Sequence, residues 1–158
     1  MKKITTDFLT PLIKQYQIGG KIKKYNGECV VADNKLGELI LKLLWVRDQA
    51  HIFHWQTKAN AQHIILGEFY TEFLDEVDEL VEGIFGVTGE LFTIGAGSMN
   101  FVDFSEENLK EFLMKTTNIF NKDFSNNFEK NKENDGLYHT VGDILQIIAK
   151  LKYLLSQK

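Results

Sequence analysis

Three of the four histidines in this chain lie within one short stretch, HIFHWQTKANAQH, at residues 51–63. Histidine is the commonest metal ligand among side chains and also titrates near neutral pH. The following segment, EFYTEFLDEVDELVE (residues 68–82), is dense in carboxylates. Imidazole together with carboxylate suits iron, manganese or zinc. The chemistry to weigh first is therefore metal binding.

Most of the carboxylates in this segment are spaced as one solvated helix face, which is a common feature of helices that binds nothing. That stripe comprises Glu68, Glu72, Asp75, Glu79 and Glu82. Asp78 and Glu82 differ from the rest, because they lie four residues apart beside apolar Val77 and Val81. Both carboxylates thus share one face of the helix near its apolar edge. We take them as candidate metal ligands.

Distance along a helix decides how these ligands can meet. At about 1.5 Å per residue, the fifteen residues from His63 to Asp78 span roughly 22 Å. One chain therefore cannot close His54, His63, Asp78 and Glu82 around one metal. If the four form one site, a second subunit must supply half of it, and a two-fold axis then creates two equivalent sites.

The other histidines and the tryptophans have simpler interpretations. His51 follows Asp48 by three residues and is expected to be packed or bonded to water. His139 is expected to be a polar residue near the start of a helix. Trp45 and Trp55 are expected to anchor the core or an interface.

Several function classes find little support. Gly95-Ala96-Gly97 lacks the third glycine of a dinucleotide loop, and no phosphate-binding lysine motif is present. A serine or cysteine nucleophile paired with histidine stays open, without a local signature. Cys29 is the only cysteine, so no internal disulfide can form. The net charge of −4 argues against a general nucleic-acid surface.

The size and apolar spacing predict one helical domain. With 158 residues, 44% of them hydrophobic, the chain is long enough for one core. Helices are expected over 35–58, 60–85 and 105–124, and a fourth carries Val141 to Leu155 at steps of three and four. A long glycine-containing link separates the second and third helices, as in four-helix bundles with a crossover connection.

The expected domain organisation is an appendage, residues 1–34, attached to a bundle over residues 35–158. The appendage is expected to hold a helix at 5–17, and the best strand candidate is 29–32. No apolar run reaches the roughly 18 to 20 residues of a transmembrane helix. We expect a cytoplasmic protein, since the first residues also lack a signal-peptide pattern.

The spacing of the candidate ligands resembles the Dps family (DNA protection during starvation) of ferritin-like, iron-oxidising proteins. Here His54-Trp55 ends the first helix, His63 begins the second, and Asp78 and Glu82 follow at offsets of fifteen and nineteen residues. The resemblance implies an all-α, ferritin-like four-helix bundle with a ferroxidase site between subunits. It also implies iron as the metal, with zinc or manganese as alternatives.

Two departures from the Dps pattern bear on the site. Gly67 stands where that family has an aspartate ligand, and the link from His54 to His63 is three residues shorter. These departures predict weak binding of one metal, or none. The lysine-rich tail that many Dps proteins use on DNA is also lacking, so DNA protection ranks as a third option.

The phrase HWQTKANAQHIILGEFYTEF looks still closer to an uncharacterised group of small phage-encoded helical proteins with similar wording. That likeness covers about residues 45–86 and implies the cytoplasm of a phage host as the location. The function expected from the sequence is binding, and oxidation, of ferrous iron at the interface of a two-fold dimer or larger homo-oligomer. The alternative is a non-enzymatic bundle that serves as a protein-interaction or structural module with an unknown protein partner.

Overall fold

The chain divides into two compact units, residues 1–33 and 34–158. A computed structural model describes residues 24–25, 28–29, 35–89, 94 and 98–157. In the first unit, strand β1 (Lys24–Tyr25) pairs antiparallel with β2 (Glu28–Cys29). The strand therefore begins one residue earlier than predicted. The helix expected at 5–17 and the remainder of the predicted strand, 30–32, lie outside the described residues.

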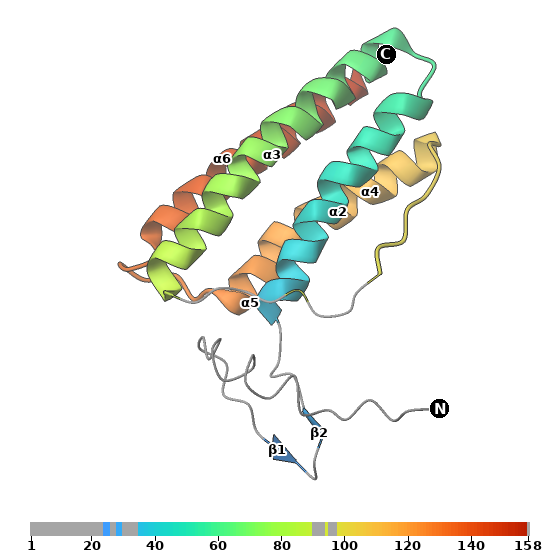
Figure 1. Cartoon of the computed structure of the whole chain (residues 1–158). Helices are drawn as coiled ribbons and strands as arrows, with labels where there is room; N and C mark the ends of the chain where they lie inside the picture. The colour runs from blue at the N-terminus through green and yellow to red at the C-terminus, as the bar shows by residue number, and fades with distance from the viewer. Residues whose placement is uncertain (1–23, 26–27, 30–34, 90–93, 95–97, 158) are drawn as a thin grey trace, which may run out of the picture. The chain divides into compact units, whose positions relative to one another are not determined.

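The second unit is helical throughout its described elements, so the all-α prediction is confirmed (Figure 1). Its first two helices form an antiparallel pair joined by residues 57–59. The third rod is a composite of two helices and a π-helix, and the fourth returns along it. The elements are α2 (Lys35–Gln56), α3 (Asn60–Thr88), α4 (Glu106–Asn118), η2 (Ile119–Phe124), α5 (Ser125–Asn127) and α6 (Asp135–Ser156). Among the described residues, none of the helices is long and apolar enough to cross a membrane.

The four rods form a closed ring in which α2 contacts α3 and α4, and α6 contacts α3 and α4. Gln56 at the end of α2 binds the backbone of Phe104, just before α4 begins. Lys42, nearer the start of α2, binds Asp123, just after α4 ends. Helix α4 therefore runs antiparallel to α2 and parallel to α3. This direction requires the chain to return along the bundle between α3 and α4, which confirms the predicted long crossover.

The returning segment is held along α2 by polar side chains. Gln49 is fully buried, and its amide donates to the carbonyl oxygen of Val102 at 2.8 Å and accepts from its N–H at 2.9 Å. Trp45 donates from Nε1 to the carbonyl oxygen of Asn100 at 2.9 Å. A buried amide with both ends satisfied by one backbone residue fixes the register of the crossover on α2.

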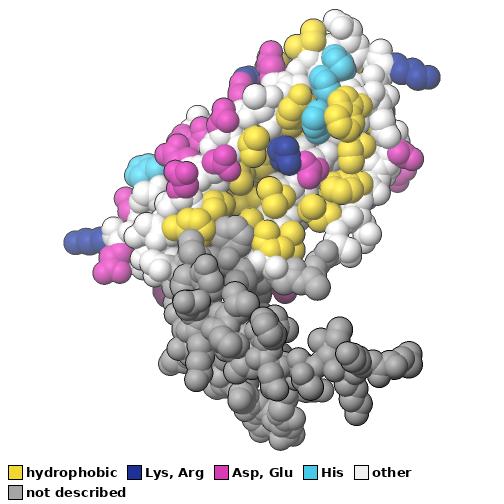
Figure 2. Space-filling model, viewed as in Figure 1, with side chains coloured by type: hydrophobic (Ala, Val, Ile, Leu, Met, Phe, Trp, Pro, Cys, Tyr) yellow, Lys and Arg dark blue, Asp and Glu magenta, His cyan; other side chains and the backbone are white. Residues whose placement is uncertain are grey.

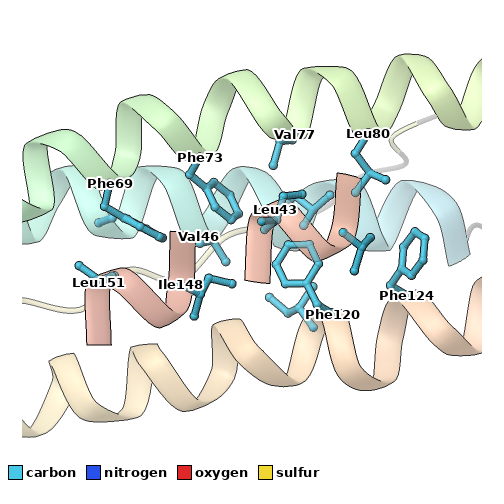
Figure 3. Close-up of a cluster of buried hydrophobic side chains, with 14 of the residues drawn as sticks. Leu43, Val46, Phe69, Phe73, Val77, Leu80, Phe120, Phe124, Ile148 and Leu151 are labelled. Atoms are coloured by element: carbon cyan, nitrogen blue, oxygen red, sulfur yellow. The ribbon is translucent and has the colours of Figure 1, made fainter. Parts of the chain in front are cut away.

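Large apolar residues from all four rods meet in the core (Figure 3). Helix α3 buries six residues that follow one another at steps of three and four along one face, namely Leu66, Phe69, Phe73, Val77, Leu80 and Ile84. In the third rod, Phe124 points inward, whereas Asp123 pairs with Lys42 outside. Leu155, expected on the seam of α6, is only partly buried.

Helix ends follow local chemistry. Ser105 caps α4, since its side chain accepts from the N–H of Asn108 at 3.0 Å. Helix α3 extends past Gly83 and Gly86 to Thr88, three residues beyond the prediction, and ends where Gly89 adopts a φ of 66°. Only a glycine adopts this left-handed conformation without strain.

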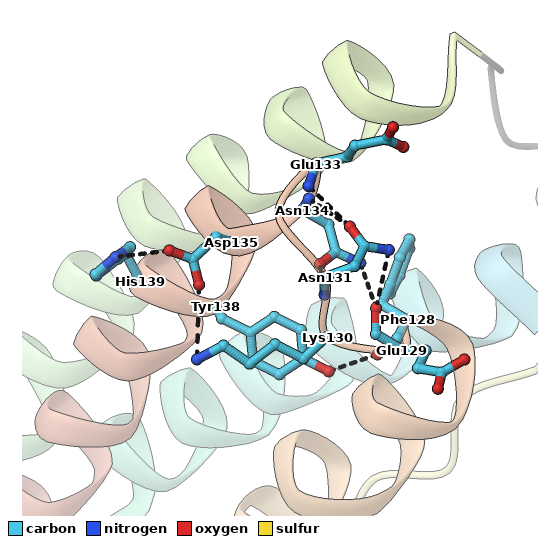
Figure 4. A network of polar contacts seen from close by, with 9 residues as sticks. All are labelled: Phe128, Glu129, Lys130, Asn131, Glu133, Asn134, Asp135, Tyr138 and His139. Carbon is cyan, nitrogen blue, oxygen red and sulfur yellow. Dashed lines mark hydrogen bonds and ion pairs between the residues drawn. The ribbon is translucent and has the colours of Figure 1, made fainter.

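The link from α5 to α6 is a compact polar turn (Figure 4). Asn131 and Asn134 hydrogen-bond each other's backbone, and Asn134 also donates to the carbonyl oxygen of Glu129 at 2.7 Å. Because this network fixes the turn, α6 begins at Asp135, earlier than the apolar spacing indicated. His139 lies within its first turns, 3.6 Å from Asp135, and its side chain is 81% exposed. It is the polar residue that was expected.

Candidate metal site at the corner of α2 and α3

The predicted histidines lie at the corner where α2 ends and α3 begins. Thr57 and Gln62 close the turn between the helices, the threonine hydroxyl donating to the amide oxygen at 2.7 Å. His54 belongs to the last turn of α2 and His63 to the first turn of α3. The short turn thus brings together two histidines that are nine residues apart in sequence.

The rings of His54 and His63 are stacked, with centroids 3.8 Å apart and planes inclined by 23°. His54 Nδ1 lies 2.7 Å from the carbonyl oxygen of His63, and His63 Nδ1 lies 2.9 Å from that of His54. A carbonyl oxygen can only accept, so each Nδ1 carries the hydrogen. In the neutral rings each Nε2 then keeps its lone pair, and no hydrogen bond from a described residue occupies it.

Gly67 makes room for this pair. A Cβ at that position would lie 3.1 Å from both Cε1 and Nδ1 of His54, which is closer than an ordinary van der Waals contact. The residue that departs from the Dps pattern is therefore one on which the ring of His54 rests. A side chain at position 67, aspartate included, requires that ring to move.

His51 extends the cluster outward. Its ring stacks on Tyr70 with centroids 4.1 Å apart and lies 4.0 Å from the Trp55 ring. Desolvation by these neighbours lowers the pKa of His51 below 6.5; the charges on His54 and Arg47 act in the same direction. The ring is packed, which was one of the two expected environments. Trp55 itself is 66% exposed, so it does not belong to the core.

Asp78 and Glu82 do not join the histidines within the chain. Both are exposed on α3, and neither side chain forms an ion pair or hydrogen bond with a described residue. Fifteen residues of straight helix keep Asp78 roughly 22 Å from His63. Accordingly, the described part of the chain contains no group of three or more His, Cys, Asp or Glu residues that could hold a metal ion.

The remaining carboxylates of α3 behave as a solvated face (Figure 2). Glu72 pairs with Lys150 of α6 at 3.0 Å, and the other four members of the predicted stripe are exposed. Glu76 lies outside that stripe. Its pKa is raised by desolvation and by the nearby charges of Glu79 and Asp143.

Residues 54–155, from the last turn of α2 to the end of α6, match the pattern that defines a known protein family. The chain belongs to DUF5856, a family of unknown function. The segment shared with DUF5856 includes both stacked histidines, Gly67 and the two carboxylates, whereas Trp45 and Gln49 precede it. Neither the curated proteins nor the solved structures contain a match to this member of DUF5856.

Sequence reasoning missed one ring of the corner. Tyr70 stacks on His51 and meets the His54 ring edge-on, with centroids 5.5 Å apart. It follows His63 by seven residues, which is two helix turns and therefore the same face. That spacing was the available signal, but an isolated tyrosine on a helix is more often simple packing.

Proposed function

We propose that this protein is a ferritin-like bundle, related to Dps proteins, that binds iron at sites shared between two copies. His54 and His63 of one copy and Asp78 and Glu82 of the other are the ligands. The observation that supports this most is the pair of Nδ1 contacts to backbone carbonyls. Histidines that ligate metals through Nε2 commonly donate their other N–H in this way, which orients the ring and raises its basicity.

The donor set fits iron. Two neutral imidazoles and two carboxylates suit Fe²⁺, and carboxylate oxygens also stabilise the higher charge of Fe³⁺. In the proposed reaction ferrous iron is the substrate, which loses one electron to an external oxidant. Because the two rings are stacked, one ion can bind both Nε2 atoms only after the ring planes splay apart beyond 23°.

The outer face of α2 and α3 offers an apolar surface to which a second copy can bind. Hydrophobic side chains gather over these helices beside the histidines (Figure 2). Leu44 precedes His51 by seven residues and Leu74 follows Tyr70 by four, so both continue the faces that carry the ring cluster. We call Leu44, His51, Trp55, Tyr70 and Leu74 the α2/α3 face. A two-fold axis across it reverses α3 of the second copy, which brings that copy's carboxylates towards the histidine end.

A titration with anaerobic Fe(II), and with Zn(II) as a redox-inert ion, tests the site at neutral pH. The wild type is expected to bind saturably, and His63→Ala to lose most of its affinity. His139→Ala is the matched control, because that histidine lies exposed on α6 and is expected to leave binding unchanged. Absence of saturable binding by the wild type contradicts the proposal.

Mixing two defective variants tests whether a site is shared. His63→Ala retains the carboxylates, and the double variant Asp78→Asn/Glu82→Gln retains the histidines. Random pairing makes about half of the dimers mixed, and each of these carries one intact site of two. About a quarter of wild-type metal binding should therefore return. A mixture that binds no more than its components excludes a shared site.

A second function, a non-enzymatic interaction module, is favoured by a different observation. Hydrogen bonds to the backbone already satisfy the Nδ1 atoms, so the histidine pair is arranged without a metal. Trp55 and Ile64 expose 66% and 50% of their surface nearby. A wild type that binds neither ion but dimerises through the α2/α3 face supports this function instead.

A further inference from the structure

A separate cleft lies on another side of α2, where the crossover and the third rod meet it. Its volume is about 370 Å³, within the range of small-molecule sites. It is lined by Lys42, Trp45, Asn100, Lys115, Asn118, Ile119 and Asp123. None of these residues takes part in the histidine corner.

An aromatic surface forms one wall of this cleft. Trp45 packs against Phe112 with ring centroids 5.8 Å apart, and its indole N–H is already bound by the carbonyl oxygen of Asn100. The ring is therefore held by its contact with Phe112 and by the hydrogen bond at its polar edge. A fixed indole with its only donor satisfied offers a flat apolar surface, on which a planar ring can stack.

Positive charge lies at the rim. Lys115 forms an ion pair with Glu111 at 2.8 Å, but both side chains are more than half exposed. Such a pair is weak in water, so the ammonium can exchange it for an anionic ligand. Lys42 contributes a second ammonium, which Asp123 neutralises at 2.8 Å. Because Glu111 and Asp123 balance the two ammonium groups, an anionic ligand binds by displacing Glu111 from Lys115.

The third rod is not a regular α-helix where it lines the cleft. Ile119 and Asp123 belong to the π-helix η2, which follows α4 directly. π-helical turns are rare and are frequently found at functional sites. Here η2 directs Phe120 and Phe124 into the core while Asp123 reaches Lys42 across the cleft.

We propose that this cleft binds a small planar aromatic anion, such as an aromatic carboxylate. The ring stacks on Trp45, and the carboxylate pairs with Lys115. The side chain of Asn118 has no hydrogen bond to another described residue and offers its amide at the same rim. This site and the histidine corner are independent, so either can fail without the other.

The test uses 2-naphthoate as the probe and the indole N–H signal of Trp45 in ¹H–¹⁵N NMR spectra as the readout. Trp55→Phe assigns the two indole signals. We expect a saturable shift at Trp45, none at Trp55, and a dissociation constant of about 1 mM or below, as is usual for a ligand of this size. Uncharged 2-naphthamide should bind more weakly.

Two variants localise the binding. Lys115→Glu should weaken the affinity for 2-naphthoate about fivefold or more, since it reverses the charge at the rim. Lys110→Glu, an exposed change on the same helix away from the cleft, should leave it within about twofold. Asn118→Trp, which adds bulk at an exposed lining position, should block it. No saturable shift at Trp45 up to about 5 mM probe, or equal effects of the two lysine variants, overturns the proposal.

Discussion

Gly67 links local helix chemistry to the geometry of the histidine pair. Alanine in place of glycine in a helix normally stabilises it by up to about 1 kcal/mol. At position 67 the added Cβ would lie 3.1 Å from two ring atoms of His54. We expect Gly67→Ala to gain less stability than this and to displace the ring from His63. Urea unfolding and the histidine ring signals in NMR spectra measure both effects.

Gly86→Ala is the matched control, because a Cβ there meets nothing within 4 Å. It should gain the full helix-propensity term while the histidine signals stay in place. Equal gains in the two variants, with unchanged ring signals, would show that His54 does not rest on Gly67.

His51 makes stability depend on pH at the same corner. Its pKa is lowered from 6.5 in the folded protein, chiefly by desolvation, so folding favours the neutral ring. The stability that the neutral His51 ring contributes is complete above about pH 6.5. It is lost as the pH falls through the lowered pKa of the folded state. In His51→Phe, which keeps an aromatic ring, the loss of stability between about pH 7.5 and about pH 5 should be smaller than in the wild type.

Chemical denaturation at the two pH values gives this comparison. His139→Gln removes an exposed histidine of α6 and serves as the control, with a pH dependence close to that of the wild type. If His51→Phe loses as much stability on acidification as this control, the titration of His51 has no part in folding.

At the scale of the elements, Gln49 is the clamp that holds the crossover on α2. Its amide satisfies both backbone groups of Val102 while remaining fully buried. Gln49→Leu leaves both groups without their partner, which should cost about 1–3 kcal/mol. Gln146→Leu, at an exposed position of α6, should cost far less. Urea midpoints measure the loss of stability. Faster hydrogen exchange of the Val102 amide in Gln49→Leu would show that the hydrogen bonds of Gln49, and not only the volume of its side chain, hold the crossover.

The packing of α3 on α6 depends on a second glycine. A Cβ at position 83 would lie 2.8 Å from Cδ2 of Leu137, which is buried. Gly83→Ala should therefore lower the thermal midpoint relative to Gly86→Ala, three residues further along the same helix. An equal rise of the thermal midpoint in the two variants would mean that Leu137 moves away freely.

The helices could be predicted because each repeats its apolar residues with the helical period, as Leu66 to Ile84 do. The crossover followed from the absence of that period between α3 and α4. The π-helix could not be predicted, since Thr116, Phe120 and Phe124 lie four residues apart, which an ordinary helix also accommodates, and packing decides the extra residue. The stacking of His54 on His63 likewise depends on the turn at residues 57–59, and the geometry of that turn cannot be deduced from residue spacing.

At the scale of the whole molecule, the shared metal site requires that two copies associate through the α2/α3 face. Leu74 lies on this face and is only partly buried in the single chain. A charge at this position should therefore destabilise the folded chain little, whereas a charge buried in an interface between two copies should destabilise that interface strongly. Light scattering should give the wild type a mass at least twice the 18.2 kDa of one chain and give Leu74→Glu the mass of one chain. Met114→Glu is the control: Met114 is 61% exposed on α4, remote from the α2/α3 face, and the variant should keep the wild-type mass. A monomeric wild type would leave Asp78 about 22 Å and Glu82 about 28 Å from His63, and the proposed iron site could not form.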